Sequence, residues 1–193
     1  MTKLAIIVGS TRQNRQTAKQ ASWVAKTAQK LEAVTAEVLD LVDYPMPFFD
    51  EPISPRYNAD RIIDPAVKKW LDALQPFDAY IFVTPEYNHS ITGVLKNALD
   101  YLTTELYHKP VAIISHGSVG GARAAMQLRE ILSESRAITI PNAVAFMGVS
   151  EGIDEQGNLS EALKANPYGP QAALDATLTE LKWYSDALAK ART

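Results

Sequence analysis

Short apolar runs alternate with amphipathic helical patterns along this chain, and no other feature of the sequence constrains the fold as strongly. Strands that alternate with helices are typical of βαβ units, in which successive strands run parallel within one sheet. The apolar runs predict five strands, at residues 4–8, 34–41, 79–83, 110–115 and 143–147. Apolar residues at helical spacing predict five helices, at residues 17–31, 65–74, 93–102, 122–132 and 172–191, and the segment 150–170 is predicted to be a loop.

Five parallel strands with five helices fit a flavodoxin-like three-layer α/β/α sandwich, with a five-stranded parallel sheet in the order 2-1-3-4-5. In this fold the ligand crevice lies outside the carboxyl ends of strands one and three, where the strand order reverses. The chain has no internal repeat, low-complexity tract or shift in composition. We therefore expect residues 1–193 to form a single flavodoxin-like domain.

The composition narrows the range of functions. A hydrophobic fraction of 47% and a charged fraction of 21% are ordinary for a soluble globular protein, and the net charge of −3 argues against nucleic acid or an anionic membrane as the main partner. The chain has no cysteine, which excludes disulfides, thiol catalysis and thiolate-bound metals, so redox chemistry would need a bound cofactor. No metal site is predicted. Because neither a signal peptide nor an apolar run of ~20 residues is present, the cytoplasm is the expected location.

The first candidate loop, Gly9–Thr17, ends the first strand and opens the first helix. Helix N-termini present unpaired amides and a partial positive charge, which favour anions such as phosphate. Ser10, Thr11 and Thr17 add hydroxyls, and Arg12 can supply a bidentate fork. The loop has neither GxGxxG nor GxxxxGK[ST], so a dinucleotide fingerprint is not supported and a nucleotide P-loop is excluded. The alternative is an ordinary strand-to-helix turn with a Ser or Thr N-cap.

The second candidate loop follows the third strand, in the stretch TPEYNHSITGVLKNALDYL at residues 84–102. Pro85 ends the strand, and Tyr87 could line a flat ring. Backbone amides of Glu86–His89 could bond the edge of a heteroaromatic ring, and Asn88 can both donate and accept, which suits a pyrimidine edge. The alternative for Tyr87 is a surface aromatic packed on the following helix.

A third loop, Ser115–Gly121, follows the fourth strand and carries three glycines in five positions, which lets the backbone pass close to a ligand. His116 could bond the ring or a second substrate. The alternative is a flexible turn before the next helix, with His116 a bystander.

Four motifs carry a family resemblance: GSTR at Gly9–Arg12, YPMPFFDEP at Tyr44–Pro52, the stretch at residues 84–102, and GGARAAMQLREIL at Gly120–Leu132. With them the chain resembles the NADPH-dependent FMN reductase family, the flavodoxin-like group that contains bacterial quinone, azo-dye and chromate reductases. The motifs occur in the expected order over about four-fifths of the chain.

The resemblance implies FMN as cofactor and NADPH or NADH as donor, with hydride passing from nicotinamide to flavin N5. The electrons then pass to a small-molecule acceptor, such as a quinone, an azo compound, a free flavin or a metal oxyanion, in a ping-pong cycle. Since flavin N5 carries the chemistry, no catalytic side chain is implied. A homodimer or homotetramer is the implied assembly.

The resemblance also assigns roles to residues. The implied FMN-binding residues are Ser10, Arg12 and Thr17 for the phosphate, Pro85, Glu86, Tyr87 and Asn88 for the isoalloxazine, and Ser115, Gly117 and Gly120 closing over it. Arg15 and Gln16 could serve instead of Thr17, because this part of the loop varies in the family. The chain departs from the family at Thr92, where proline is frequent, and position 89 varies.

Two other functions stay open from the residues alone. One is a flavodoxin-like electron carrier that acts on protein partners without oxidising NAD(P)H, against which the small net charge and the arginine-bearing loop argue. The other is a flavin-free interaction protein. In the proline-rich segment 43–55, Tyr44, Phe48 and Phe49 could line the ring, form a subunit contact or pack locally over the sheet edge.

Overall fold

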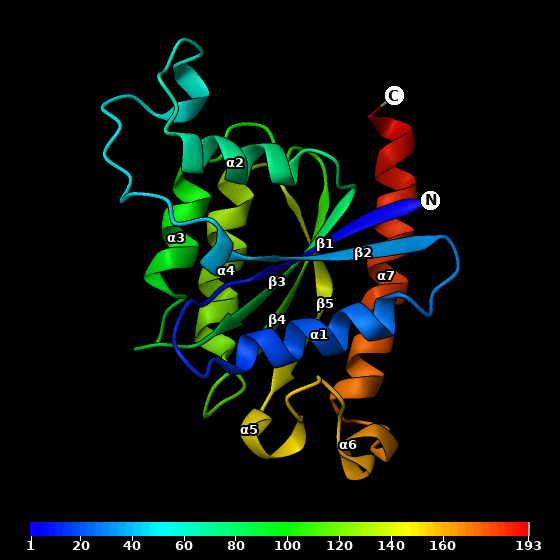
Figure 1. Cartoon of the computed structure of the whole chain (residues 1–193). Coiled ribbons are helices and arrows are strands. Elements are labelled where there is room, and N and C mark those ends of the chain that lie inside the picture. Colours follow the sequence, from blue (N-terminus) through cyan, green and yellow to red (C-terminus); the bar gives the residue numbers. More distant parts are fainter. Residues whose placement is uncertain (193) are drawn as a thin grey trace.

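The computed structural model describes residues 1–192, and its centre is a parallel sheet of five strands in the order β2-β1-β3-β4-β5. This order confirms the one predicted from the sequence. Figure 1 shows the sheet between two layers of helices. The strands are β1 (Thr2–Val8), β2 (Val34–Asp40), β3 (Ala79–Pro85), β4 (Pro110–His116) and β5 (Ile138–Phe146).

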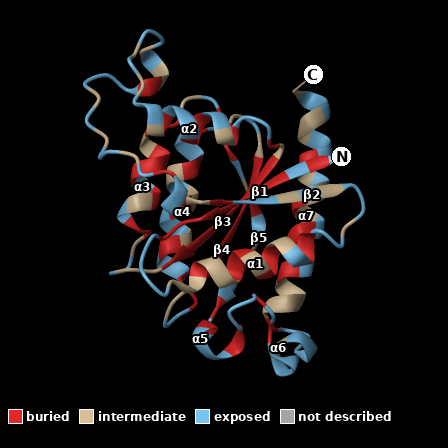
Figure 2. Ribbon diagram, in the orientation of Figure 1, coloured by how far each residue is buried: buried red, intermediate tan, exposed pale blue. Residues whose placement is uncertain are grey.

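Two apolar cores hold the helices against opposite faces of the sheet. Successive strand residues point to opposite faces, so Ile7 and Phe82 enter one core while Ile6 and Ile81 enter the other. Figure 2 shows buried residues running the length of the central strands. The first core is covered by α2 (Pro65–Leu74), α3 (Gly93–Asp100) and α4 (Ala122–Glu134), and the second by α1 (Gln16–Ala28) and α7 (Pro170–Ala191).

Most predicted boundaries lie within two residues of those in the structure, and the larger differences are at β5, α1 and the segment 150–170. β5 begins at Ile138 rather than at residue 143; it contains Pro141, which is tolerated because β5 pairs only with β4 and lies at the sheet edge. α1 ends at Ala28 rather than at residue 31. The segment predicted as a loop, 150–170, contains two short helices. They are α5 (Val149–Gly152), which starts one residue before the segment, and α6 (Glu161–Ala165).

The proline-rich segment after β2 crosses the face covered by α2 and α3, and it includes the short 3₁₀ helices η1 (Leu41–Asp43) and η2 (Pro55–Tyr57). Asn97 on α3 fastens it by donating to the Pro47 carbonyl (2.7 Å) and accepting from the Phe49 amide (2.8 Å). Tyr44 packs on Trp70 and Phe49 on Tyr101, each edge to face. Tyr44 and Phe49 therefore pack locally.

The remaining aromatic residue of this segment, Phe48, is 85% exposed. Among residues 1–192, no helix is both long and apolar enough to cross a membrane.

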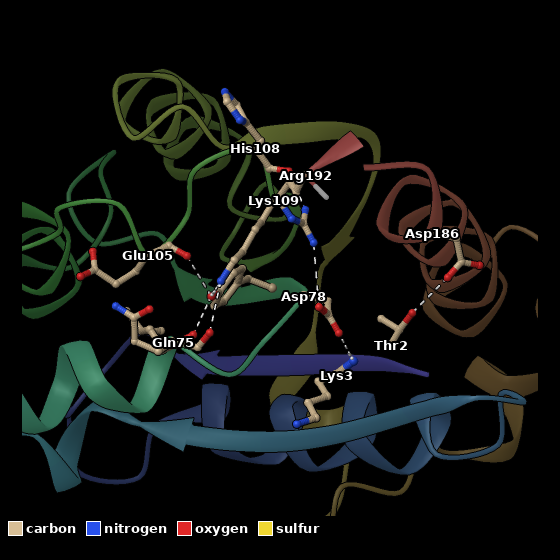
Figure 3. Close-up of polar contacts among 11 residues, drawn as sticks. Thr2, Lys3, Gln75, Asp78, Glu105, His108, Lys109, Asp186 and Arg192 are labelled. Atoms are coloured by element: carbon tan, nitrogen blue, oxygen red, sulfur yellow. Dashed lines mark hydrogen bonds and ion pairs between the residues drawn. The ribbon is translucent and has the colours of Figure 1, made fainter. Parts of the chain in front are cut away.

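The amino-terminal edge of the sheet carries a closed polar network (Figure 3). The Tyr80 hydroxyl accepts from Lys109 Nζ (3.1 Å) and lies 2.7 Å from the Leu74 carbonyl and 3.1 Å from that of Glu105. Burial raises the pKa of Tyr80, and burial also lowers the pKa of Lys109. Both side chains are thus removed from water, and the contacts above supply their hydrogen bonds, as is normal for buried polar groups.

A second group of polar contacts at this edge anchors the last helix. Asp78 accepts from the Lys3 amide (2.9 Å) and lies 3.9 Å from the Arg192 guanidinium, which also donates to the His108 carbonyl (2.8 Å). Nearby, the Thr2 hydroxyl donates to Asp186 on α7 (3.3 Å). The end of α7 is thereby tied to the starts of β1, β3 and β4.

Candidate functional site

The turn from β1 into α1 approaches β3 so closely that only glycine fits at its start. The Gly9 amide donates to the Val83 carbonyl (2.9 Å), and a Cβ on Gly9 would lie 2.8 Å from that same oxygen. Ser10 is buried, with its Oγ 3.2 Å from the Tyr87 hydroxyl and accepting from the Arg12 amide at 3.3 Å. The first loop is therefore built against the end of β3.

The amino terminus of α1 lacks a side-chain cap. Asn14 has a positive φ of 56°, which turns the chain into the helix, and Arg15 at the N-cap makes no side-chain cap hydrogen bond. Helix termini leave their first amides unpaired unless a cap or a ligand satisfies them. The predicted alternative, a Ser or Thr N-cap, is therefore wrong.

Buried polar atoms without partners gather at this end of α1. In residues 1–192, four of the six such side-chain atoms belong to the stretch 15–20: Arg15 Nε, Gln16 Oε1, Thr17 Oγ1 and Gln20 Nε2. Thr17 and Gln20 are fully buried. An unsatisfied buried polar group costs about 1–3 kcal/mol, so a concentration of them points to a missing hydrogen-bonding partner.

The two arginines of this loop differ in their partners. Arg15 forms an ion pair with Asp40, the last residue of β2. Arg12 pairs with no carboxylate in the part of the chain that the structure describes, and its guanidinium lies 5.7 Å from the centre of the Tyr87 ring. Arg12 is therefore the arginine whose donors are available to an anion.

The loop after β3 forms a tight hairpin. Tyr87 and Ser90 exchange two backbone hydrogen bonds of 3.0 Å, and Asn88 and His89 between them both have positive φ, of 50° and 66°. Two consecutive left-handed residues define a type I′ turn, in which asparagine is favoured. Both turn residues are exposed.

This hairpin changes which amides could reach a ligand. The Glu86 amide donates to the His116 carbonyl (2.8 Å), and the Tyr87 amide is used within the turn. The amides of Asn88 and His89 make no hydrogen bond to residues 1–192. Of the four amides expected to bond a ring edge, these two therefore have free donors.

Glu86 ties the second loop to α4. One carboxylate oxygen accepts from the Arg123 amide (3.0 Å) and the other from Arg123 Nη1 (2.6 Å). Glu86 thus caps a helix whose own N-cap, Gly121, has no side chain. Burial alone would raise the pKa of Glu86, but the hydrogen bonds and charge of Arg123 lower it overall. The carboxylate is therefore ionised and occupied within the protein at neutral pH.

The loop after β4 depends on its glycines. Gly120 and Gly121 have positive φ of 69° and 74°, and a Cβ on Gly121 would lie 2.8 Å from the His116 amide nitrogen. Ser115 Oγ closes the loop by donating to the Gly120 carbonyl (2.7 Å). The Ser115–Gly121 segment thus forms a turn that is closed by this hydrogen bond and depends on two left-handed glycines.

His116, the last residue of β4, reaches across to α1. Its Nδ1 lies 2.7 Å from Gln20 Oε1, and burial lowers the pKa of His116 to about 4. The imidazole is therefore neutral at pH 7. Gln20 was not singled out from the sequence; its only signal is the spacing of three from Thr17, which places both on one helix face.

A cleft of about 490 Å³ lies where these loops meet. Its lining residues are Arg12, Gln13, Asn14, Arg15, Gln16, Pro85, Glu86, Tyr87, His116 and Gly117. Of the predicted site residues, Ser10, Thr17, Ser115 and Gly120 are buried among the elements that form the cleft, and Asn88 lies at the exposed hairpin tip.

Comparisons with known proteins agree with this architecture. The model of the family described as NADPH-dependent FMN reductase matches residues 2–151. The chain is 35% identical over 158 residues to the NAD(P)H-dependent FMN reductase ntnL of Nectria sp, covering 80% of this chain and 79% of that protein. It is 32% identical over 172 residues to the NAD(P)H-dependent FMN reductase C4B3.06c of Schizosaccharomyces pombe, covering 84% and 86%.

Among solved structures, the flavoenzyme NAD(P)H:(acceptor) oxidoreductase FerB from Paracoccus denitrificans has a TM-score of 0.70 at 21% identity, with 98% of each chain covered. At that identity the likeness supports the fold alone, whereas the family match and the identities above concern the sequence itself. The chain belongs to the NADPH-dependent FMN reductase family.

Proposed function

We propose that this protein is an FMN-dependent NAD(P)H oxidoreductase that passes electrons to a small planar acceptor, such as a quinone, an azo compound or a flavin, in a ping-pong cycle. Family membership implies the FMN cofactor and the NAD(P)H donor. One relative, from Bacillus sp., is named an NADPH azoreductase, and another, from Pseudomonas putida, a quinone reductase, which supports this class of acceptor.

The observation that carries the proposal is the uncapped, unsatisfied amino terminus of α1 at one end of the cleft. Thr17 Oγ1 is buried without a partner, the helix lacks a side-chain cap, and Arg12 has no carboxylate partner within residues 1–192. A phosphate would satisfy all three, because it accepts hydrogen bonds and is stabilised at helix N-termini. The residues present therefore fit the FMN phosphate.

The site residues take the following roles in this proposal. Arg12, Thr17 and the backbone amide of Gln16 bind the phosphate, while Ser10, whose hydroxyl already contacts Tyr87, positions the Tyr87 ring. Pro85, Tyr87 and Asn88 surround the isoalloxazine on one side, and Ser115, Gly117 and Gly120 shape the loop on the other. Glu86 acts through Arg123, since its carboxylate is engaged there.

When bound, FMN supplies the redox chemistry by taking electrons from NAD(P)H and giving them to the acceptor. The protein supplies orientation and electrostatics. The free amides of Asn88 and His89 are donors that could stabilise negative charge on the reduced ring. Because His116 is neutral and Glu86 is ion-paired with Arg123 at pH 7, neither group is an acid that would donate a proton.

An anaerobic absorbance titration of the FMN-loaded protein with NADPH, and separately with NADH, tests the proposal. Rapid bleaching of the flavin band by either nucleotide is the expected result, and the faster donor identifies the preferred one. Steady-state rates with a quinone acceptor should then give parallel double-reciprocal lines, as a ping-pong cycle requires. A protein that retains FMN but is bleached by neither nucleotide would be an electron carrier, and the proposal would be wrong.

We also propose a homodimer or homotetramer, on the family resemblance alone. Sedimentation velocity of the FMN-loaded protein would contradict this if it showed only a monomer.

A further inference from the structure

The interaction between His116 and Gln20 is not explained by the proposed phosphate and ring contacts. His116 ends β4 beside Pro85 of β3, yet its side chain points to α1, where Nδ1 meets Gln20 Oε1 at 2.7 Å. The ring is only partly exposed and lines the cleft. A buried glutamine is thus used to hold a histidine at the cleft wall.

The chemistry of this pair determines what the other ring nitrogen can do. A glutamine Oε1 can only accept a hydrogen bond, so His116 Nδ1 carries the proton. In a neutral imidazole the second nitrogen is then an acceptor, and burial keeps the ring neutral, with a pKa of about 4. His116 Nε2 makes no hydrogen bond to any residue from 1 to 192. The cleft therefore presents a fixed, uncharged acceptor to a ligand that can donate.

The position of the imidazole indicates which part of FMN it would meet. Gln20, which holds the imidazole, belongs to α1, the helix whose amino terminus is proposed to bind the phosphate. The His116 backbone, in contrast, adjoins Gly117 and is paired with Pro85, at the proposed ring end. The imidazole therefore lies between the two ends of the cleft. In FMN the group between phosphate and ring is the ribityl chain, whose hydroxyls are hydrogen-bond donors.

We propose that His116 is a positioning residue that accepts a hydrogen bond through Nε2 from a ribityl hydroxyl of FMN, while Gln20 fixes the tautomer and the ring orientation. This inference rests on the proposed function, because it requires FMN in the cleft. It explains why a polar side chain at the fully buried position 20 has its oxygen directed at the imidazole. It assigns His116 to cofactor binding rather than to the second substrate or to proton transfer.

The test compares two ligands and three proteins by fluorescence titration of the free cofactor. The ligands are FMN and the matched flavin in which an unsubstituted pentyl chain joins the ring to the phosphate. The proteins are the wild type, His116→Phe, which removes the acceptor, and His116→Gln, which keeps an acceptor oxygen. We expect His116→Phe to weaken FMN binding by about 3- to 10-fold, as for one lost hydrogen bond, and to leave the pentyl flavin unchanged. His116→Gln should recover most of the FMN affinity.

A second readout does not depend on cofactor binding. Nitrogen-15 NMR of the apo protein should show His116 as the Nδ1–H tautomer, and Gln20→Leu should shift the tautomer population. In the binding titration, Gln20→Leu should also reduce the affinity for FMN more than the affinity for the pentyl flavin. Melting of each apo variant checks that the fold is intact.

Equal losses for the two ligands would place the His116 contact elsewhere, and unchanged FMN affinity in His116→Phe would remove the contact; either result overturns the inference. If the wild type binds neither ligand, the proposed function fails instead. That outcome is distinguishable because the NMR tautomer is measured without ligand.

Discussion

Polar groups at the amino ends of the strands (the amino edge) are hydrogen-bonded within the protein, whereas several at the carboxyl ends (the carboxyl edge) are not. At the amino edge the Tyr80 hydroxyl has one donor and two carbonyl oxygens around it, and Asp78 accepts from a backbone amide near Arg192. At the carboxyl edge Thr17 Oγ1 and Gln20 Nε2 are buried without partners. Since unsatisfied buried groups destabilise a fold, the carboxyl edge retains them at a cost that ligand binding can offset.

The contrast separates stability from function in this fold. The amino edge fastens the end of α7 to three strands, and Tyr80, Asp78 and Thr2 are each hydrogen-bonded within the chain there. The carboxyl edge presents an uncapped helix, a tight hairpin and a glycine turn around a cleft. Changes at the amino edge should therefore reduce stability, and changes at the carboxyl edge should reduce FMN affinity.

The largest expected effect is that of a substitution at Gly121, which should reduce both stability and FMN affinity. Gly121→Ala places a Cβ 2.8 Å from the His116 backbone nitrogen, at a φ of 74°. We expect the free energy of unfolding to fall by about 2–3 kcal/mol through strain and displaced backbone, and FMN affinity to fall with it. Urea unfolding and FMN titration measure the two effects.

Gly93→Ala is the matched control for that variant. Gly93 is the first residue of α3, and a Cβ there would have no neighbour within 4 Å. Its free energy of unfolding should change by less than about 0.5 kcal/mol. If Gly121→Ala were as stable as Gly93→Ala, the tight turn would not be needed for the fold.

Arg12→Ala should weaken FMN binding by about 1.5–3 kcal/mol, the range for hydrogen bonds to a charged group, which is roughly 10- to 150-fold. Arg15→Ala in the same loop should weaken it less, because Arg15 is paired with Asp40. Apo stability should hardly change in Arg12→Ala. A larger binding loss in Arg15→Ala would reverse our assignment of the two arginines.

His116 adds a pH dependence to apo stability. Its folded pKa of about 4 lies below the unfolded value of about 6.5, so between these values the unfolded chain binds the proton more readily. The free energy of unfolding should therefore rise with pH in this window, by up to ~1.4 kcal/mol per pH unit from this group. Urea unfolding at pH 5 and pH 6.5 should show a smaller rise in His116→Gln; an equal rise would mean that burial does not depress this pKa.

The fold was predictable because each central strand is a continuous apolar run, buried on both faces as parallel strands are. The start of β5 was missed because residues 138–142 alternate and include Pro141, which an edge strand accommodates. The three loops were located from glycine, proline and polar residues directly after strands. Their position at one edge then followed from the parallel topology.

The pairings inside the site were not predictable in the same way. Glu86 with Arg123 and His116 with Gln20 join residues 37 and 96 positions apart, and no periodicity relates them. The sequence indicated Glu86 as a cofactor-binding residue but gave no sign that its carboxylate also caps α4. Spacing identifies which residues share an element, but contacts between elements depend on packing that a single sequence does not encode locally.

The most direct test measures apo stability and FMN affinity together in Thr17→Val and Tyr80→Phe. Thr17→Val removes a buried hydroxyl that has no partner, so apo stability should be unchanged or rise by about 1 kcal/mol while FMN binds about 2- to 10-fold more weakly. Tyr80→Phe removes a satisfied hydroxyl, so apo stability should fall by about 1–2 kcal/mol with FMN affinity unchanged. Two results would contradict the conclusion that the unpaired polar groups of the carboxyl edge serve cofactor binding. One is unchanged FMN affinity in Thr17→Val, and the other is the same change in stability and in affinity in both variants.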